Sequence, residues 1–149
     1  MKIIFVENQR FTQWWLWVIL ISFPIMAFGP FDDKSINYNH LLIGFALPVI
    51  FYLFQLRIKV SSEGLHYQFF PFHLKYHIIK SEEIKKVESL KYKPLAEYGG
   101  WGIKYGFKGK AYNASGNFGV KVYLRNGTNI LFGSQKHKDL EKALKKIKK

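Results

Sequence analysis

Two long stretches without formal charge fill the first third of the sequence and limit what the chain can fold into. The first covers residues 11–31 and the second covers residues 35–56, and neither contains Asp, Glu, Lys or Arg. At about 1.5 Å of helical rise per residue, each would reach roughly 30 Å, the thickness of a bilayer's hydrocarbon core. The pattern predicts two membrane-spanning helices, at about 11–31 and 36–56. Two core helices of a small domain are the alternative, which apolar residues on every helix face disfavour.

Three tryptophans, Trp14, Trp15 and Trp17, lie at the start of the first stretch. Amphipathic rings favour membrane interfaces, so we expect these residues to be interfacial anchors. A short polar segment joins the two stretches, which predicts an antiparallel hairpin. The lipid bilayer itself is therefore the first predicted partner.

The placement of basic residues predicts the orientation of this hairpin. Arg10 precedes the first stretch and Arg57 follows the second, whereas the connecting segment has one lysine beside two aspartates. Both termini are therefore expected in the cytoplasm. A cleaved signal peptide is the alternative, because Ala27 and Gly29 form a small-x-small pattern. The long tryptophan-rich apolar region and the second stretch favour an uncleaved multi-pass protein.

The chain is strongly basic, and the charge is unevenly placed. Residues 57–149 carry the whole net charge of +13, because the acidic and basic residues before them cancel. Such a segment beside a membrane would attract anionic lipid headgroups. Nucleic acid is not expected, since no recognition motif is visible. Lysines near the C-terminus are the candidate membrane-surface contacts: Lys142, Lys145, Lys146, Lys148 and Lys149.

Residues 57–149 show the pattern of about seven short strands followed by one helix. Asn126-Gly127 lies between two alternating apolar segments and predicts a hairpin with a type I′ turn. Ser134 is an N-cap candidate for a helix over about 135–148. One apolar stripe of that helix should face a core: Leu140, Ala143, Leu144 and Ile147. The segment predicts a β-sandwich or barrel closed by a C-terminal helix.

A resemblance is carried by Tyr92-Lys93-Pro94-Leu95-Ala96-Glu97-Tyr98-Gly99-Gly100-Trp101-Gly102-Ile103, by the segment at 110–117 and by Gly133-Ser134-Gln135. With these motifs the chain resembles small bacterial two-span membrane proteins that carry a C-terminal pleckstrin-homology-like domain of uncharacterised function. The resemblance implies an α+β membrane protein of the bacterial inner (plasma) membrane, with a transmembrane hairpin at 1–56 and a cytoplasmic domain at 57–149. Phosphoinositide-binding members of the wider fold use a basic first loop. Here that loop is Ser61-Ser62-Glu63-Gly64, so specific inositol-phosphate binding is not expected.

Few residues suggest a ligand site. Asn113, Ser115 and Asn117 form a polar loop that could contact a small polar ligand, although turn chemistry explains the same residues. His73 and His77 are four apart without a third ligand nearby, so no metal is expected. The glycines at 99–102 match neither nucleotide fingerprint and predict a turn. The chain has no cysteine, which excludes disulfides and thiol nucleophiles, and no cofactor is expected.

These observations predict a non-enzymatic, membrane-tethered interaction module that binds a protein segment or an anionic lipid surface. The alternative is a membrane-bound enzyme with an unrecognised polar site. A deep polar pocket that combined Glu97, a histidine and the loop at 113–117 would favour the enzyme. A shallow groove beside an open strand edge would favour the module, whose partner would be an unidentified membrane or cytoplasmic protein.

Overall fold

The chain forms two compact units in this computed structural model, which describes residues 2–26 and 38–148. The first unit combines Met1–Arg10 with Gln55–Lys149, and the second is Phe11–Phe54. The second unit is thus an insertion in the sequence of the first. The first ten residues belong to the β-rich unit rather than to the hairpin segment, and this differs from the expected division at 56/57.

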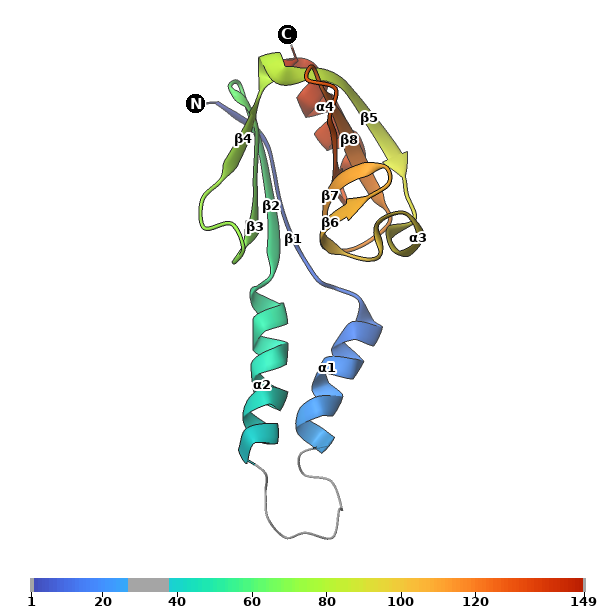
Figure 1. Cartoon of the computed structure of the whole chain (residues 1–149). Coiled ribbons are helices and arrows are strands. Elements are labelled where there is room, and N and C mark those ends of the chain that lie inside the picture. The colour runs from blue at the N-terminus through green and yellow to red at the C-terminus, as the bar shows by residue number, and fades with distance from the viewer. Residues whose placement is uncertain (1, 27–37, 149) are drawn as a thin grey trace. The chain divides into compact units, whose positions relative to one another are not determined.

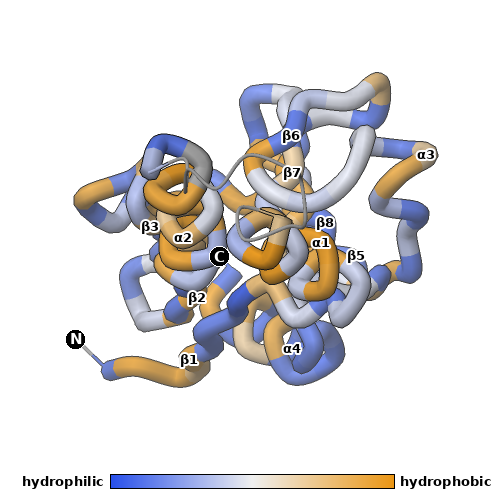
Figure 2. The backbone as a smooth tube through the Cα atoms, turned by 90° about the horizontal axis from the view of Figure 1, so that it is seen from below, coloured by the Kyte–Doolittle hydropathy of each residue, from blue (hydrophilic) through white to orange (hydrophobic). Residues whose placement is uncertain are grey.

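The second unit contains two helices, α1 (Trp14–Met26) and α2 (Tyr38–Leu53). Both helices are rich in hydrophobic residues, as the orange colour at α1 and α2 shows (Figure 2). The helices approach closely at Gly44, where an added Cβ would lie 2.9 Å from the Cα of Pro24. The ring of Phe11 packs edge-on against a ring of α2, with centroids 5.9 Å apart. Packing against each other therefore buries part of each helix, including Leu20.

The expected transmembrane hairpin is not found. Among the residues that the structure describes, no helix is long and apolar enough to cross a membrane. α1 has 13 residues and α2 has 16, so at 1.5 Å per residue they reach about 20 Å and 24 Å, short of a bilayer core. The predicted spans at 11–31 and 36–56, and the multi-pass inner-membrane placement built on them, are therefore wrong. Residues 27–37, which both predictions touched, lie outside the described part.

The first sheet of the β-rich unit is antiparallel, with strand order β1-β2-β3-β4. Its strands are β1 (Ile3–Arg10), β2 (Gln55–Ser61), β3 (Gly64–Phe70) and β4 (His77–Lys80). β2 shows the reason for strand formation, since Leu56, Ile58 and Val60 alternate along it and are fully buried. β1 was not predicted, and it forms one edge of this sheet.

The second sheet has strand order β5-β8-β9-β7-β6, in which β7 and β9 are parallel and the other pairs antiparallel. Its strands are β5 (Ile84–Lys91), β6 (Gly102–Gly106), β7 (Gly109–Asn113), β8 (Phe118–Leu124) and β9 (Asn129–Gly133). Three helical segments complete the unit: η1 (Ser81–Glu83), α3 (Pro94–Tyr98) and α4 (His137–Ile147). Figure 1 shows the two sheets and these helices.

Aromatic rings form the core between the two sheets. Tyr67 of β3 lies 4.9 Å from Tyr112 of β7 and 5.0 Å from Phe132 of β9, measured between ring centroids. Helix α4 contacts strands of both sheets, among them β5, β8, β1 and β2. Its predicted stripe is confirmed, because each of its members is buried: Leu140, Ala143, Leu144 and Ile147. Helix and sheets thus share one hydrophobic interior.

Two predicted local details differ in the structure. The hairpin at Asn126-Gly127 joins β8 to β9, and Gly127 has a φ of 89°. Among the described residues no non-glycine has a positive φ, so Asn126 does not adopt the conformation of a type I′ turn. The N-cap position of α4 is Lys136 rather than Ser134. The hydroxyl of Ser134 accepts the Lys136 amide at 3.0 Å and so shapes the turn before the helix.

Candidate functional site

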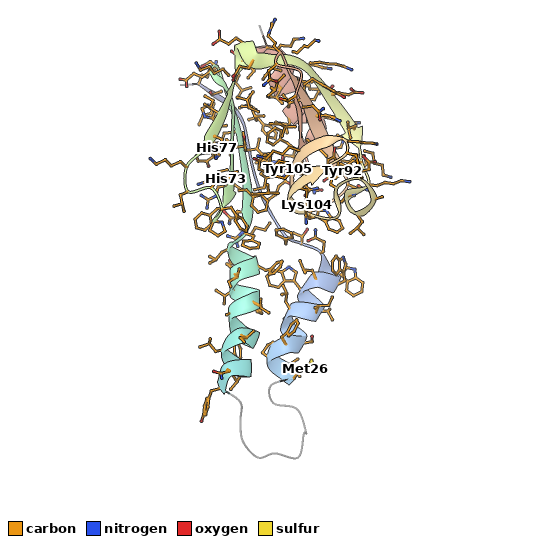
Figure 3. The ribbon with its side chains drawn as sticks, in the orientation of Figure 1. Met26, His73, His77, Tyr92, Lys104 and Tyr105 are labelled. Atoms are coloured by element: carbon orange, nitrogen blue, oxygen red, sulfur yellow. The ribbon has the colours of Figure 1, made fainter. Side chains whose placement is uncertain are left out.

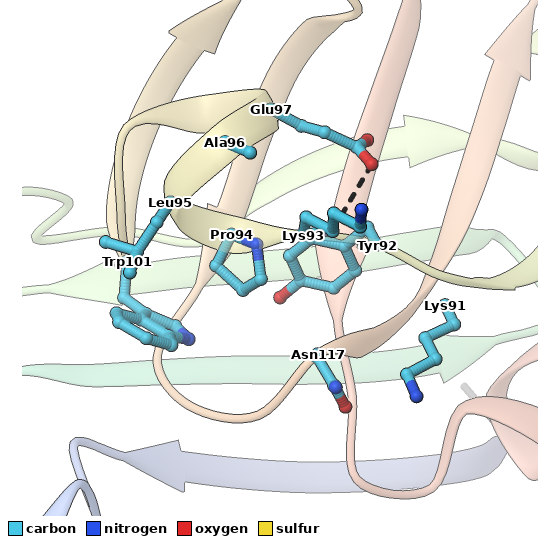
Figure 4. Close-up of a pocket in the computed structure, with 9 residues that line it drawn as sticks. All are labelled: Lys91, Tyr92, Lys93, Pro94, Leu95, Ala96, Glu97, Trp101 and Asn117. Atoms are coloured by element: carbon cyan, nitrogen blue, oxygen red, sulfur yellow. Dashed lines mark hydrogen bonds between the residues drawn. The ribbon is translucent and has the colours of Figure 1, made fainter.

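A groove beside α3 is a concave site of the β-rich unit. Its volume is about 620 Å³, within the usual range for ligand and peptide sites. It is shallow and mostly apolar, and Figure 4 shows the residues that line it: Lys91, Tyr92, Lys93, Pro94, Leu95, Ala96, Glu97, Trp101 and Asn117. We call this site the α3 groove.

Helix α3 begins and ends where the sequence requires. Pro94 occupies the first turn, where its missing amide hydrogen costs nothing. Gly99 ends the helix in the left-handed conformation, with φ 71° and ψ 21°, which glycine adopts without strain. Its amide donates to the carbonyl of Leu95 at 3.0 Å, and the Gly100 amide donates to the carbonyl of Pro94 at 2.9 Å. Gly99 thus closes the helix and Gly102 begins β6, so the predicted turn corresponds to the short connection between α3 and β6.

Two aromatic side chains of the groove are held by hydrogen bonds. The indole Nε1 of Trp101 donates to the carbonyl of Gly116 at 2.9 Å. The Tyr92 amide donates to the carbonyl of Asn117 at 2.8 Å, and the Tyr92 hydroxyl accepts from Asn113 Nδ2 at 3.1 Å. Because neighbouring loops hold both rings in place, the apolar lining of the groove is preformed.

The predicted polar loop is mostly part of this support. Asn113 is fully buried, and its Oδ1 accepts the Gly102 amide at 2.8 Å. Ser115 is buried too, and Gln135 Nε2 donates to its carbonyl at 3.0 Å and to its hydroxyl at 3.2 Å. Asn117 lines the groove. Of the three candidates, Asn117 is therefore the one placed to meet a ligand, and the other two hold the scaffold.

Strand β1 supports the same region from the other sheet. Glu7 is buried, and its carboxylate accepts from Ser134 Oγ at 2.5 Å and from the Gln135 amide at 2.9 Å. Gln9 Nε2 donates to the carbonyl of Gly133 at 2.6 Å. Neither residue is predicted from the sequence, although the β-branched residues at the start of the chain are a signal for a strand. The first and last parts of the chain are thereby joined behind the groove.

The electrostatics of the groove are dominated by lysines. Lys91 and Lys93 are exposed at its edge. Glu97 is engaged elsewhere, since its carboxylate lies 3.2 Å from Lys108 Nζ and accepts the Lys93 amide at 3.3 Å. Burial opposes ionisation of Glu97, but these two hydrogen bonds hold its pKa below the usual value. The carboxylate is therefore charged, partnered and unsuited to proton transfer at neutral pH.

Burial raises the pKa of Tyr92 to about 12, a shift that its hydrogen bond from Asn113 partly opposes. The unfolded chain would ionise this phenol near 10, so the folded state loses stability as the pH rises from about 10 to 12. Tyr92→Phe should lower the free energy of unfolding by about 1 kcal/mol at pH 7, because the hydrogen bond is lost. It should also reduce the loss of stability between about pH 10 and 12. Burial also raises the pKa of Tyr67, so the Tyr92→Phe variant should still lose some stability at alkaline pH.

Urea unfolding at several pH values checks this expectation, with the exposed Tyr105→Phe as the matched control. Identical alkaline profiles for Tyr92→Phe and the unsubstituted chain would contradict it.

The other predicted site residues lie away from the groove's lining. Four of the C-terminal lysines, Lys142, Lys145, Lys146 and Lys148, are exposed, and Lys149 lies outside the described residues. Lys145 pairs with Glu141 at 2.8 Å. Contact of these lysines with anionic lipid headgroups stays a prediction.

The three tryptophans lie at the start of α1. Trp14 is 76% exposed and Trp15 is 41% exposed. Trp17 Nε1 donates to the carbonyl of Phe11 at 2.8 Å. Because the predicted membrane span is not found, the predicted role of these residues as its anchors has no support.

Metal binding and known relatives give no further assignment. Across residues 2–26 and 38–148, no group of three or more His, Cys, Asp or Glu side chains could hold a metal ion. Comparison of the chain with protein-family models, curated proteins and solved structures finds no match. The resemblance to pleckstrin-homology-like membrane proteins thus stays a prediction.

Proposed function

We propose that this protein is a non-enzymatic interaction module that binds an acidic protein segment in the α3 groove. The observation that carries the proposal is a shallow, preformed apolar surface edged by lysines. Peptide sites of this kind combine apolar anchor pockets with charges that set orientation and specificity.

The apolar part of the groove supports an anchor residue of the partner. Leu95 is 67% exposed, so the helix presents a large apolar side chain to solvent beside Pro94 and Trp101. Exposed apolar residues that cluster, unlike scattered ones, mark interaction sites. A leucine or an aromatic ring of a partner segment would remove this surface from water.

The charge of the groove supports an acidic partner. Lys91 and Lys93 edge the apolar surface, and the lining acid Glu97 is already neutralised by Lys108. The whole chain carries a net charge of +13, so its field attracts acidic segments before contact and repels basic ones. Charge complementarity therefore favours a segment in which Asp or Glu flanks the apolar anchor.

The geometry favours this function over an enzyme. A deep polar pocket in which Glu97 meets a histidine and the loop at 113–117 would favour an enzyme. No histidine is among the described residues that line the groove, and Asn113 and Ser115 are committed to hydrogen bonds within the scaffold. Proton transfer needs a free acid or base within reach of the substrate, which Glu97 does not provide.

Selection of short random peptides displayed on phage tests the proposal directly. The full chain should enrich sequences in which acidic residues flank an apolar residue. Leu95→Glu places a negative charge in the groove at an exposed position, and this charge repels an acidic peptide. The substitution should therefore weaken binding of the enriched peptides by about tenfold or more. Leu74→Glu is the matched control, because Leu74 is 79% exposed and does not line the groove. Equal loss in both variants, or enrichment without acidic residues, would contradict the proposal.

A further inference from the structure

A second cluster of polar side chains lies outside the α3 groove, where the two sheets face each other. His73 and His77 come from the β3–β4 side, and Lys110 comes from β7. Figure 3 shows the two histidines on the first sheet's side and Tyr105 of β6 opposite them. Within the described part of the chain, no ion pair joins any of the three basic groups to a carboxylate. The cluster therefore combines one lysine and two imidazoles without a carboxylate partner.

The geometry brings these groups within reach of one ligand. The rings of His73 and His77 are 4.3 Å apart between centroids, and His73 lies 5.6 Å from the ring of Tyr112. Lys110 Nζ lies 4.8 Å from the centroid of the Tyr112 ring and 5.1 Å from that of Tyr105. His77 is exposed, while His73 and Lys110 are half-buried. The cluster is open to solvent on one side and closed by aromatic rings on the other.

The hydrogen-bond donors of the cluster indicate a negatively charged ligand. Nδ1 of His73 accepts the Phe69 amide at 3.3 Å, so its ring proton sits on Nε2 when the imidazole is neutral. Nε2 is then a donor, as is the ammonium of Lys110. Burial, then the charges of His77 and Lys110, lower the pKa of His73, so its imidazole is neutral near pH 7 and offers a hydrogen-bond donor rather than a charge.

We propose that His73, His77 and Lys110 form a binding site for a phosphate-type anion. The ammonium of Lys110 supplies the fixed charge, and the two imidazoles supply N–H donors, a combination that suits phosphate oxygens. Burial opposes the charge on Lys110, but its hydrogen bonds with Tyr112 and Tyr105 raise its pKa, so it stays ionised at neutral pH. Tyr67 is a further titratable group beside the cluster, and its ring stacks on His77 with centroids 5.4 Å apart.

The exposed ring of Tyr105 distinguishes two sources of this ligand. Tyr105 is 77% exposed, so an aromatic phosphate ester could stack on it, whereas free phosphate could not. The shared requirement in both cases is the phosphate group held by Lys110. This site is separate from the α3 groove and does not depend on the proposed peptide binding.

The test is titration of the full isotope-labelled chain at pH 7.5 with inorganic phosphate, and separately with phenyl phosphate, followed by NMR of the histidine ring signals. We expect the signals of His73 and His77 to move and the pKa of His73 to rise as the anion binds. Lys110→Met should weaken both ligands by about tenfold or more, since it removes the fixed charge and keeps the stem. Tighter binding of phenyl phosphate that Tyr105→Ala removes would identify an aromatic ester, and equal binding would identify the phosphate group alone.

Two further variants keep the test decisive. His77→Gln changes an exposed side chain and should weaken binding without affecting folding. Lys104→Met alters the neighbouring strand at a position facing the opposite side from the Tyr105–Lys110 pair, and it should leave binding unchanged. Unmoved histidine signals with both ligands, or equal losses for Lys110→Met and Lys104→Met, would overturn the proposal.

Discussion

A chain that lacks residues 1–10 is expected to lose the cooperative folding of its β-rich unit. These residues supply β1, whose backbone pairs with β2 from Ile3 to Arg10. They also supply the Glu7 carboxylate and the Gln9 amide that bind the connection between β9 and α4. Without them, the Ser134 hydroxyl and the Gln135 amide lose a buried charged acceptor. Thermal unfolding followed by circular dichroism should show no cooperative transition.

A single substitution separates the buried hydrogen bonds from the strand itself. Glu7→Ala should lower the free energy of unfolding by about 3 kcal/mol, because each hydrogen bond to a buried charged group contributes about 1.5–3 kcal/mol. Asn8→Ala is the control on the same strand, at an exposed position, and should change stability by less than about 0.5 kcal/mol. Equal stability of the two variants would mean that the Glu7 contacts do not hold the fold.

Leu144→Ala is expected to have the second large effect. Leu144 is fully buried on the face of α4 that contacts both sheets. Truncating a buried leucine to alanine costs about 2–5 kcal/mol through lost burial and the cavity left behind, a large part of a small domain's stability. The midpoint of urea unfolding should be lower for Leu144→Ala than for Lys142→Ala, which changes an exposed residue of the same helix. Coincident midpoints would contradict the core assignment.

The sequence predicts about seven strands and a C-terminal helix in residues 57–149, and the structure has eight strands, β2 to β9, between residues 55 and 133. Alternation of apolar residues within each segment, and glycine or polar turns between segments, depend on local geometry alone. The same holds for α4, where a stripe at helical spacing identified its buried face. The pairing of β7 with β9 in parallel could not be read locally, since it joins strands whose contact depends on the whole sheet.

Strand β1 was missed because its buried face is polar. Glu7 and Gln9 point inward, so the strand lacks the apolar alternation that marks a half-buried strand. Its partner β2 lies across the insertion of residues 11–54, beyond the reach of any local pattern. The buried acid is satisfied by Ser134 and Gln135 from the far end of the sequence, and no sequence rule pairs such distant residues.

The membrane-span prediction is wrong because it took the length of each uncharged stretch as the length of a helix. The helices that the structure describes, α1 (Trp14–Met26) and α2 (Tyr38–Leu53), are both shorter than the uncharged stretches from which they were predicted. Counting strictly apolar helical residues gives shorter elements than counting uncharged ones.

The α3 groove could not be predicted from the sequence. The sequence analysis predicts no helix at Pro94, which begins the five residues of α3. The resemblance motifs do converge on this site, since Tyr92 and Trp101 line the groove and Gly116 and Asn113 hold them. Sequence could single out these segments but could not show that they meet.

The most direct test of the proposed function is an NMR footprint of a bound acidic peptide on the full chain. A peptide from the selection, with acidic residues flanking an apolar one, would be added to the ¹⁵N-labelled protein. We expect amide shifts concentrated at residues 91–102 and at Asn117, together with a shift of the Trp101 indole signal, whose partner is the Gly116 carbonyl. Shifts confined to other surfaces, with the Trp101 indole unmoved at saturation, would contradict the assignment of the α3 groove as the binding site.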